Sequence, residues 1–135
     1  MIHALVVTHG GVARELLAVV ESILGPGQGL EAMTNTAKSA QVLAEEVSDW
    51  CDAHLSGPTD GAVLFVDDMA GSCAVACRLI ANRKRPVRVL SGVNLAMLLD
   101  FTTWRESLPI EELTRRLVEK GRQAIAILPH MSGED

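Results

Sequence analysis

Two segments of the sequence combine residue types that could transfer a phosphoryl group. His9 and Gly10 follow the first apolar run, and Asp67, Gly71 and Ser72 follow a later one. A neutral imidazole attacks through one ring nitrogen, and a carboxylate that accepts a hydrogen bond from the other nitrogen fixes the tautomer and strengthens the nucleophile. Glycine N–H groups, a serine hydroxyl and the positive ends of helices can hold phosphoryl oxygens. The pattern suits a phosphohistidine, although turn and capping roles would explain the same residues.

The spacing of apolar residues predicts the elements that would position these side chains. Strands are expected at 1–7, 30–34, 62–66 and 87–90, and helices at 11–24, 39–55, 71–82, 94–103 and from 109 to about 120. A final apolar run, 124–128, is expected to form an edge strand. This alternation predicts an α/β fold, in which a doubly wound, mainly parallel sheet has helices on both faces and right-handed crossovers.

Sites in such sheets form beyond the carboxyl ends of the strands, where the strand order reverses. In a 2-1-3-4 strand order, the first and third strands are neighbours at that point. His9 follows the first strand and Asp67 follows the third, so we expect the two side chains to face each other across one crevice.

Length and composition favour one domain and exclude several kinds of partner. The 135 residues suit a single domain over 1–130, with a loose tail at 131–135. A net charge of -5 and an aromatic content of 3% argue against nucleic acid as a partner. No apolar stretch approaches the ~18 residues that a membrane span needs, and no signal peptide is evident. We therefore expect a cytoplasmic protein.

The cysteines and the missing nucleotide motif bear on cofactors. Three cysteines, at Cys51, Cys73 and Cys77, make a poor disulfide framework, and we expect them to be reduced. Cys73 and Cys77 share a helix face, but no second cysteine or histidine pair completes a metal site, so we expect core packing and no metal. The sequence has no G-x-x-x-x-G-K-[ST] loop for ATP. We expect no cofactor, and a protein as the phosphoryl donor.

Three segments together resemble a known family. IHALVVTHG, VLFVDDMAGSC and VLSGVNLAMLLD occur in this order along the chain. They are similar to the EIIA domain of the mannose family of the bacterial phosphotransferase system. In that family Thr-His-Gly follows the first strand, Asp-x-x-x-Gly-Ser the third and Gly-Val-Asn-x-x-Met-Leu the fourth. The resemblance covers nearly the whole chain.

The resemblance implies a phosphotransferase with a phosphohistidine intermediate. His9 would accept the phosphoryl group from HPr, a histidine phosphocarrier, and pass it to a histidine of an EIIB domain. Asp67 would hold the ring nitrogen that is not phosphorylated. The resemblance also implies a homodimer, in which the last strand crosses to the partner's sheet edge. No EIIB domain follows within these 135 residues, so we expect a separate acceptor protein, and membrane contact only through a permease complex.

Three positions depart from the family pattern. Asp68 is a second carboxylate where a neutral residue is more common, and we expect it to point away from the site, where it can cap a helix. Ala70 stands where glycine is common, and Cys73 where proline is common. These changes bear on the fit of a partner more than on the nucleophile.

Three other interpretations compete with this one. A phosphocarrier that serves dihydroxyacetone kinase shares the fold and the histidine, but the Gly-Val-Asn segment favours the mannose family. A stand-alone regulatory phosphoprotein would use the same histidine to control the binding of another protein. A response-regulator receiver domain is disfavoured, because it needs an acidic pair after the first strand, where this chain has His9.

Overall fold

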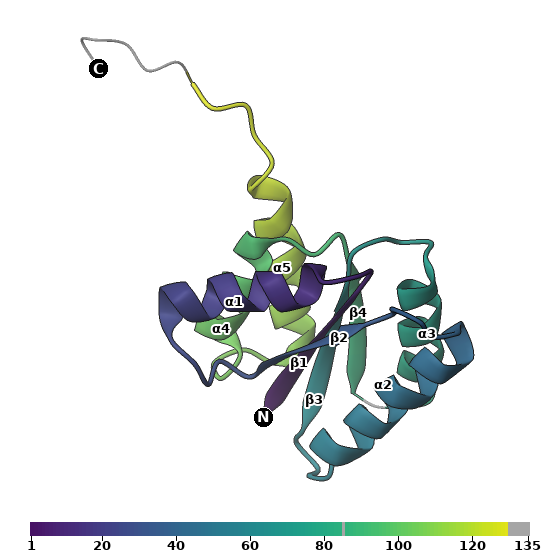
Figure 1. Cartoon of the computed structure of the whole chain (residues 1–135). Helices are drawn as coiled ribbons and strands as arrows, with labels where there is room; N and C mark the ends of the chain where they lie inside the picture. The colour runs from purple at the N-terminus through teal and green to yellow at the C-terminus, as the bar shows by residue number, and fades with distance from the viewer. Residues whose placement is uncertain (85, 130–135) are drawn as a thin grey trace, which may run out of the picture.

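A four-stranded parallel sheet forms the centre of the structure, a computed structural model that describes residues 1–84 and 86–129 (Figure 1). The strands are β1 (Ile2–Thr8), β2 (Leu30–Thr34), β3 (Gly61–Val66) and β4 (Val87–Ser91). Their order is β2-β1-β3-β4, and each neighbouring pair is parallel. The predicted α/β fold and the predicted strand order are therefore confirmed.

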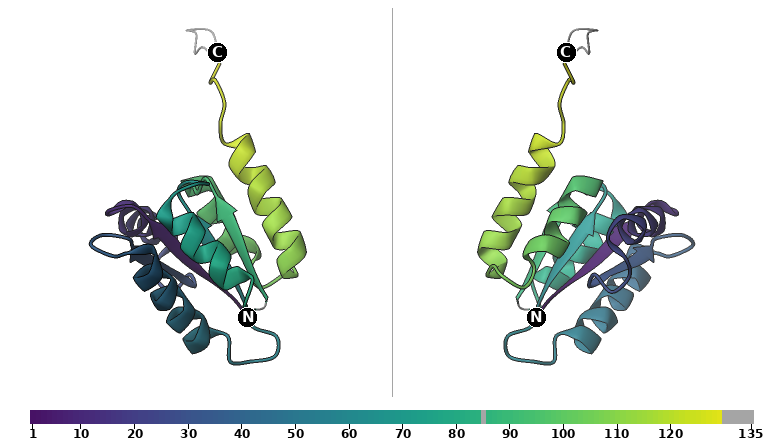
Figure 2. Two further views of the ribbon diagram at one scale, coloured as in Figure 1. Left: turned by 90° about the vertical axis from the view of Figure 1, so that its right-hand side faces the viewer. Right: turned by 90° about the vertical axis from the view of Figure 1, so that its left-hand side faces the viewer.

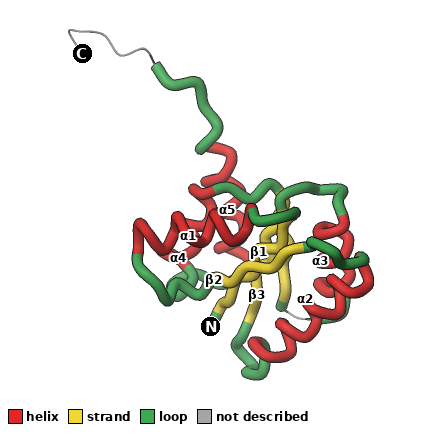
Figure 3. Tube along the Cα trace, viewed as in Figure 1, coloured by secondary structure: helices red, strands yellow, loops and turns green. Residues whose placement is uncertain are grey.

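Helices cover both faces of the sheet, which lies between them in Figures 1 and 3. One face carries α1 (Val12–Leu24), α4 (Leu95–Trp104) and α5 (Ile110–Gln123). The other face carries α2 (Ala40–His54) and α3 (Ser72–Ala81). Each layer contributes one hydrophobic core, so the sheet is shielded from water on both sides.

Side chains of β1 alternate between the two cores. Ala4 and Val6 pack with α1, α4 and α5, whereas Leu5 and Val7 pack with α2 and α3. Because both faces are covered, β1 and β3 are almost continuously apolar. Burial on both faces also specifies the register, in which Val7 lies opposite Val66. The residues that follow β1 and β3 consequently emerge side by side at the carboxyl end of the sheet.

Capping side chains explain where two of the helices begin. The Ser39 hydroxyl accepts a hydrogen bond from the Val42 N–H (3.1 Å) at the start of α2. Asn94 Oδ1 accepts one from the Met97 N–H (3.1 Å) at the start of α4. Each cap satisfies an N–H group that the first turn of a helix leaves without an acceptor. All the elements predicted before residue 124 are present, within one residue of their expected bounds except at the end of α5.

The C-terminal edge strand expected at 124–128 does not form in the single chain, and the structure corrects that part of the prediction. α5 continues to Gln123 with Ala124 as its C-cap, and residues 125–129 then extend away from the sheet (Figure 2). Among residues 1–84 and 86–129, no strand lies beside this segment to supply backbone partners. The expected tail at 131–135 and the domain end at 130 lie outside the described residues.

No helix in the described part of the chain combines the length and the apolar character that crossing a bilayer requires.

Candidate active site

His9 is the first residue after β1, at the carboxyl end of the sheet. The buried Thr8 hydroxyl accepts a hydrogen bond from the Ala13 N–H (2.8 Å), which ties the end of β1 to the first turn of α1. Gly10 completes the turn between them with a φ of 55°, a conformation that side chains disfavour. The short connection leaves half of the His9 side chain (51%) exposed above the sheet.

Asp67 holds His9 at two points. One carboxylate oxygen, Oδ2, accepts hydrogen bonds from the His9 backbone N–H (3.0 Å) and lies 2.9 Å from ring Nδ1. A carboxylate only accepts hydrogen bonds, so in this contact Nδ1 carries the proton. The neutral ring therefore keeps its lone pair on Nε2, which is the nitrogen left to act as a nucleophile. The predicted pairing of His9 with Asp67 across the sheet is present in the structure.

The surroundings of Asp67 keep its carboxyl group ionised. Partial burial opposes the charge, but the hydrogen bonds from the backbone and ring of His9 outweigh it, and the net effect lowers the pKa of Asp67 below its ordinary value. The second oxygen, Oδ1, is buried and has no hydrogen-bond partner among the described residues. Asp67 thus presents a full negative charge to the ring.

Gly71 brings the start of α3 against the other side of the imidazole. It is the N-cap of the helix, and a Cβ atom at this position would lie 2.9 Å from His9 Cε1 and 3.4 Å from Nε2. Only glycine permits that approach without displacing the ring. The first N–H groups of a helix have no intrahelical acceptor and carry the positive end of its dipole, so they suit an anion attached to Nε2.

Asn35 links two predicted site residues and was not identified from the sequence. It follows β2, and its backbone N–H donates to the Thr8 carbonyl (3.1 Å). Its Oδ1 accepts from the Gly10 N–H (3.4 Å), and its Nδ2 donates to the Ser72 hydroxyl oxygen (3.3 Å). The Gly10 N–H, expected to be available for a phosphoryl group, is therefore already engaged. A polar residue directly after the strand adjacent to β1 was the signal that could have indicated Asn35.

Asp68 does not cap α3, which corrects the expectation for this residue. The helix begins at Gly71 without any side-chain cap, and the exposed Asp68 instead accepts a hydrogen bond from the Ala70 N–H (3.3 Å). Its other oxygen would lie 3.7 Å from a Cβ atom at Gly71. The second carboxylate therefore shapes the loop before α3 and stays on the rim of the site.

Cys73 lies beside the His9–Asp67 pair as well as in the core. Its side chain is fully buried under α3, as predicted. Burial raises the pKa of the Cys73 thiol, and the negative charge of Asp67 adds to that effect, so the thiol is protonated and is not a competing nucleophile. Its sulfur nevertheless shares a cluster with a ring nitrogen of His9 and a carboxylate oxygen of Asp67, within 4.8 Å of one another.

Comparison with known families shows which family the chain belongs to. The family model EIIA-man, described as the PTS system fructose IIA component, matches residues 3–118. The chain belongs to the EIIA-man family. The resemblance of its three motifs to mannose-family EIIA domains is thereby confirmed.

Individual relatives agree with the family match. The EIIA-man chain is 31% identical over 125 residues to the mannose-specific EIIAB component of the phosphotransferase system of Escherichia coli K12. The alignment covers 90% of this chain and 38% of that protein, so the chain spans well under half the length of the curated relative. Equivalent matches occur in a second Escherichia coli strain and in Shigella flexneri.

Solved structures show the same fold at lower sequence identity. An EIIA component from Streptococcus agalactiae superposes with a TM-score of 0.84 at 18% identity and covers 94% of this chain and 97% of its own. A mannose/sorbose-specific IIA subunit from Enterococcus faecalis gives 0.82 at 20% identity, with 96% and 98% covered. At these identities the likeness establishes the fold alone, and the chemistry rests on the residues of this EIIA chain.

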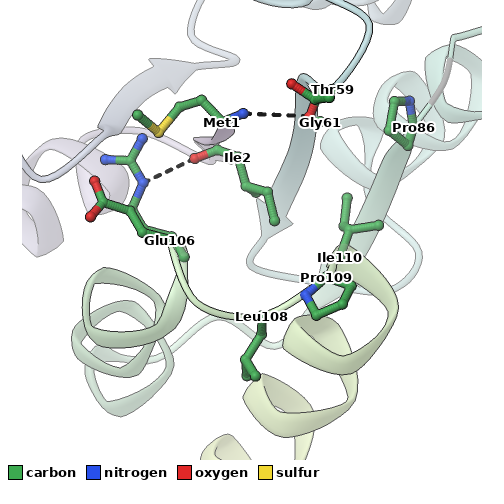
Figure 4. A pocket seen from close by; sticks show the side chains of 10 residues that line it. Met1, Ile2, Thr59, Gly61, Pro86, Glu106, Leu108, Pro109 and Ile110 are labelled. Carbon is green, nitrogen blue, oxygen red and sulfur yellow. Dashed lines mark hydrogen bonds between the residues drawn. The ribbon is translucent and has the colours of Figure 1, made fainter.

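A hollow lies at the end of the sheet opposite to His9, and Figure 4 shows the side chains that line it. Its volume is about 500 Å³, and it is bounded mainly by apolar side chains around Ile2, Leu108 and Ile110. Arg105 closes one side by donating a hydrogen bond to the Ile2 carbonyl (3.0 Å). The described lining of this hollow contains neither histidine nor cysteine.

Proposed function

We propose that this EIIA chain carries a phosphoryl group on His9, accepting it from phosphorylated HPr and delivering it to a histidine of an EIIB domain. The contact between Nδ1 and Asp67 supports the proposal most directly, because it leaves Nε2 as the nucleophile. Nε2 also faces the start of α3, where a phosphoryl group can receive backbone N–H bonds.

The transfer needs only the residues already described. The lone pair of Nε2 forms a bond to phosphorus while the bond from phosphorus to the donor histidine breaks. Positive charge then develops on the His9 ring, and the ionised Asp67 stabilises it through the hydrogen bond at Nδ1. The Ser72 hydroxyl and the N–H groups at the start of α3 would then hold the phosphoryl oxygens. Transfer to EIIB reverses these steps, with the acceptor histidine as the attacking group.

Intact-mass measurement tests this function directly. The protein is incubated with phosphoenolpyruvate, enzyme I and HPr, and we expect a mass increase of one phosphoryl group that disappears when HPr is omitted. The label should be lost in acid and retained in base, as for phosphohistidine. Adding an EIIB domain should then discharge it. A protein that takes up no label, although the same HPr phosphorylates another EIIA, would refute the proposal. A label that EIIB never removes would favour the regulatory alternative.

Asn35 contributes by positioning the Ser72 hydroxyl. Because Asn35 Nδ2 donates to the Ser72 oxygen, the hydroxyl proton is free to point toward a phosphoryl oxygen. We expect Asn35→Ala to slow phosphorylation by phospho-HPr about three- to tenfold, the value of one polar contact. Single-turnover rates should be measured in both the wild-type and the Ser72→Ala backgrounds. If Asn35 acts through Ser72, Asn35→Ala should slow transfer in the wild type but not in Ser72→Ala. An equal loss of rate in both backgrounds would contradict this role.

The proposed function includes a homodimer formed by exchange of the C-terminal segment. Ile125, Ile127 and Leu128 are 81%, 99% and 82% exposed in the single chain. β4 is the last strand of the sheet, and a groove of about 590 Å³ runs beside it under α5. A second copy's 124–128 segment is apolar enough to fill this groove and to cover the open edge of β4.

Charged residues in the C-terminal segment should prevent the dimer. Ile125 and Ile127 would share one face of an added strand, so Ile125→Glu with Ile127→Glu places two carboxylates against the partner. We expect light scattering after size exclusion to show a dimer for the wild type and a monomer for this variant, with unchanged circular dichroism. Val42→Glu, at an exposed position on α2, is the matched control and should remain dimeric. A monomeric wild type, or a dimeric double variant, would contradict the exchange.

A further inference from the structure

Three different metal-ligating side chains converge at the carboxyl end of the sheet. His9 comes from the end of β1, Asp67 from the end of β3 and Cys73 from the first turn of α3. A ring nitrogen, a carboxylate oxygen and the sulfur all lie within 4.8 Å of one another. In the described part of the chain, this is the single group of three or more such residues close enough to share an ion.

The chemistry of the three donors indicates which ion they would hold. Imidazole, carboxylate and thiolate together are ligands of Zn²⁺, whereas Mg²⁺ and Ca²⁺ require oxygen donors throughout. Three protein ligands leave one position of a tetrahedral ion open to water, as in catalytic zinc sites.

The three side chains differ in burial in a way that favours metal binding: one side of the cluster is closed and the other is open to solvent. Cys73 closes the site from the core side, while the half-exposed ring of His9 leaves an approach from solvent. Asp67 Oδ1 is buried without a partner in the described residues, so the carboxylate can bind an ion without giving up an existing contact of that oxygen.

We propose that Zn²⁺ binds between His9, Asp67 and Cys73 and holds the protein in a form that cannot accept a phosphoryl group. Nδ1 is the ring nitrogen that faces Asp67, and it is the natural ligand. An imidazole bound to metal through Nδ1 carries its proton on Nε2, which then has no lone pair for phosphorus. The Cys73 thiol releases its proton as it binds, so uptake of one ion liberates one proton.

Zinc and the phosphoryl group therefore exclude each other at His9. A ring phosphorylated on Nε2 keeps its proton on Nδ1, where it is hydrogen-bonded to Asp67, so the ion can bind Nδ1 only by displacing that proton. Linkage makes the exclusion reciprocal, so phosphorylation should weaken zinc binding as much as zinc weakens phosphorylation. The inhibitory consequence rests on the proposed function, whereas the binding site itself does not.

Cobalt spectroscopy tests the binding site without any phosphoryl transfer. Co²⁺ is titrated into the reduced, metal-free chain, and we expect a thiolate-to-cobalt charge-transfer band that saturates at one ion per chain and is displaced by Zn²⁺. The band should be absent in Cys73→Ala and lost in His9→Gln. Cys77→Ala is the matched control, since Cys77 is equally buried one turn further along α3 and is not in the cluster. A band that persists in Cys73→Ala, or no band in the wild type, would overturn the site.

Single-turnover transfer from purified phospho-HPr tests whether bound zinc blocks phosphorylation of His9, and it does not expose enzyme I to zinc. We expect Zn²⁺ to slow phosphorylation of the wild type and of Cys77→Ala but not of Cys73→Ala. In the reverse arm, the phosphorylated protein should give no cobalt band. Zinc sensitivity that survives in Cys73→Ala, or a band of full strength after phosphorylation, would overturn the exclusion. A protein that binds Co²⁺ through Cys73 but is never phosphorylated would refute the proposed function and leave the metal site standing.

Discussion

Replacing His9 with glutamine should abolish phosphoryl acceptance while leaving the fold intact. Glutamine keeps a polar side chain of similar reach but has no nitrogen lone pair that can attack phosphorus. Half of the His9 side chain is exposed, so its loss opens no cavity in the core. The change removes the contact from Nδ1 to Asp67, which is worth about 1 kcal/mol of unfolding free energy. Intact mass after incubation with enzyme I, HPr and phosphoenolpyruvate should show no added phosphoryl group.

Another histidine of the same chain provides the control for this result. His54 is the last residue of α2 and contacts Trp50 and Glu31, neither of which belongs to the candidate site. His54→Gln should be phosphorylated to the wild-type extent. Thermal unfolding of both variants then separates a chemical effect from a structural one. Label that remains in His9→Gln would assign the phosphoryl group to a different residue and refute the central proposal.

Replacing Asp67 with alanine should slow phosphorylation strongly without preventing it. The variant keeps Nε2 but loses the group that fixes the tautomer and stabilises the charge on the ring. Loss of such a supporting carboxylate typically lowers activity about 10- to 100-fold. The backbone N–H of His9 also loses its acceptor, so the turn after β1 becomes less defined. The single-turnover rate of transfer from phospho-HPr is the quantity to measure.

Asp68 is the matched control for Asp67, because it is the next residue and carries the same charge. Asp68→Ala removes an exposed carboxylate that accepts its hydrogen bond from the Ala70 N–H and not from His9, so we expect a rate no lower than that of the wild type. Asp67→Asn keeps an acceptor oxygen without the charge, and should fall between the wild type and Asp67→Ala. A wild-type rate in Asp67→Ala would remove Asp67 from its proposed role.

The elements of the fold were predictable because their signals are local. Apolar residues at helical or strand spacing, together with turn residues such as those at 25–27 and 57–61, place each helix and strand with little ambiguity. Even the short strand at 30–34 was located correctly, although it offered the weakest pattern. The parallel arrangement follows from the alternation of strands and helices, since each connection is long enough for a crossover.

The pairing of His9 with Asp67 was also predictable, although the two residues are 58 positions apart. The strand order brings the ends of β1 and β3 together, and parallel strands deliver their following residues to the same edge of the sheet. The strand order alone was therefore sufficient to predict this contact. The strand expected at 124–128 rested on an apolar run alone, and in the described part of the chain no strand lies beside that segment to pair with it.

The sequence by itself determined the helices and strands before residue 124, the order of the strands and the placement of His9 beside Asp67. Only the tertiary structure decided which neighbours complete the site. Asn35 hydrogen-bonds Gly10 and Ser72 from the loop after β2, and the first turn of α3 places Cys73 in the cluster with His9. Periodicity and strand order do not encode such contacts, because they depend on how side chains from separate elements pack in three dimensions.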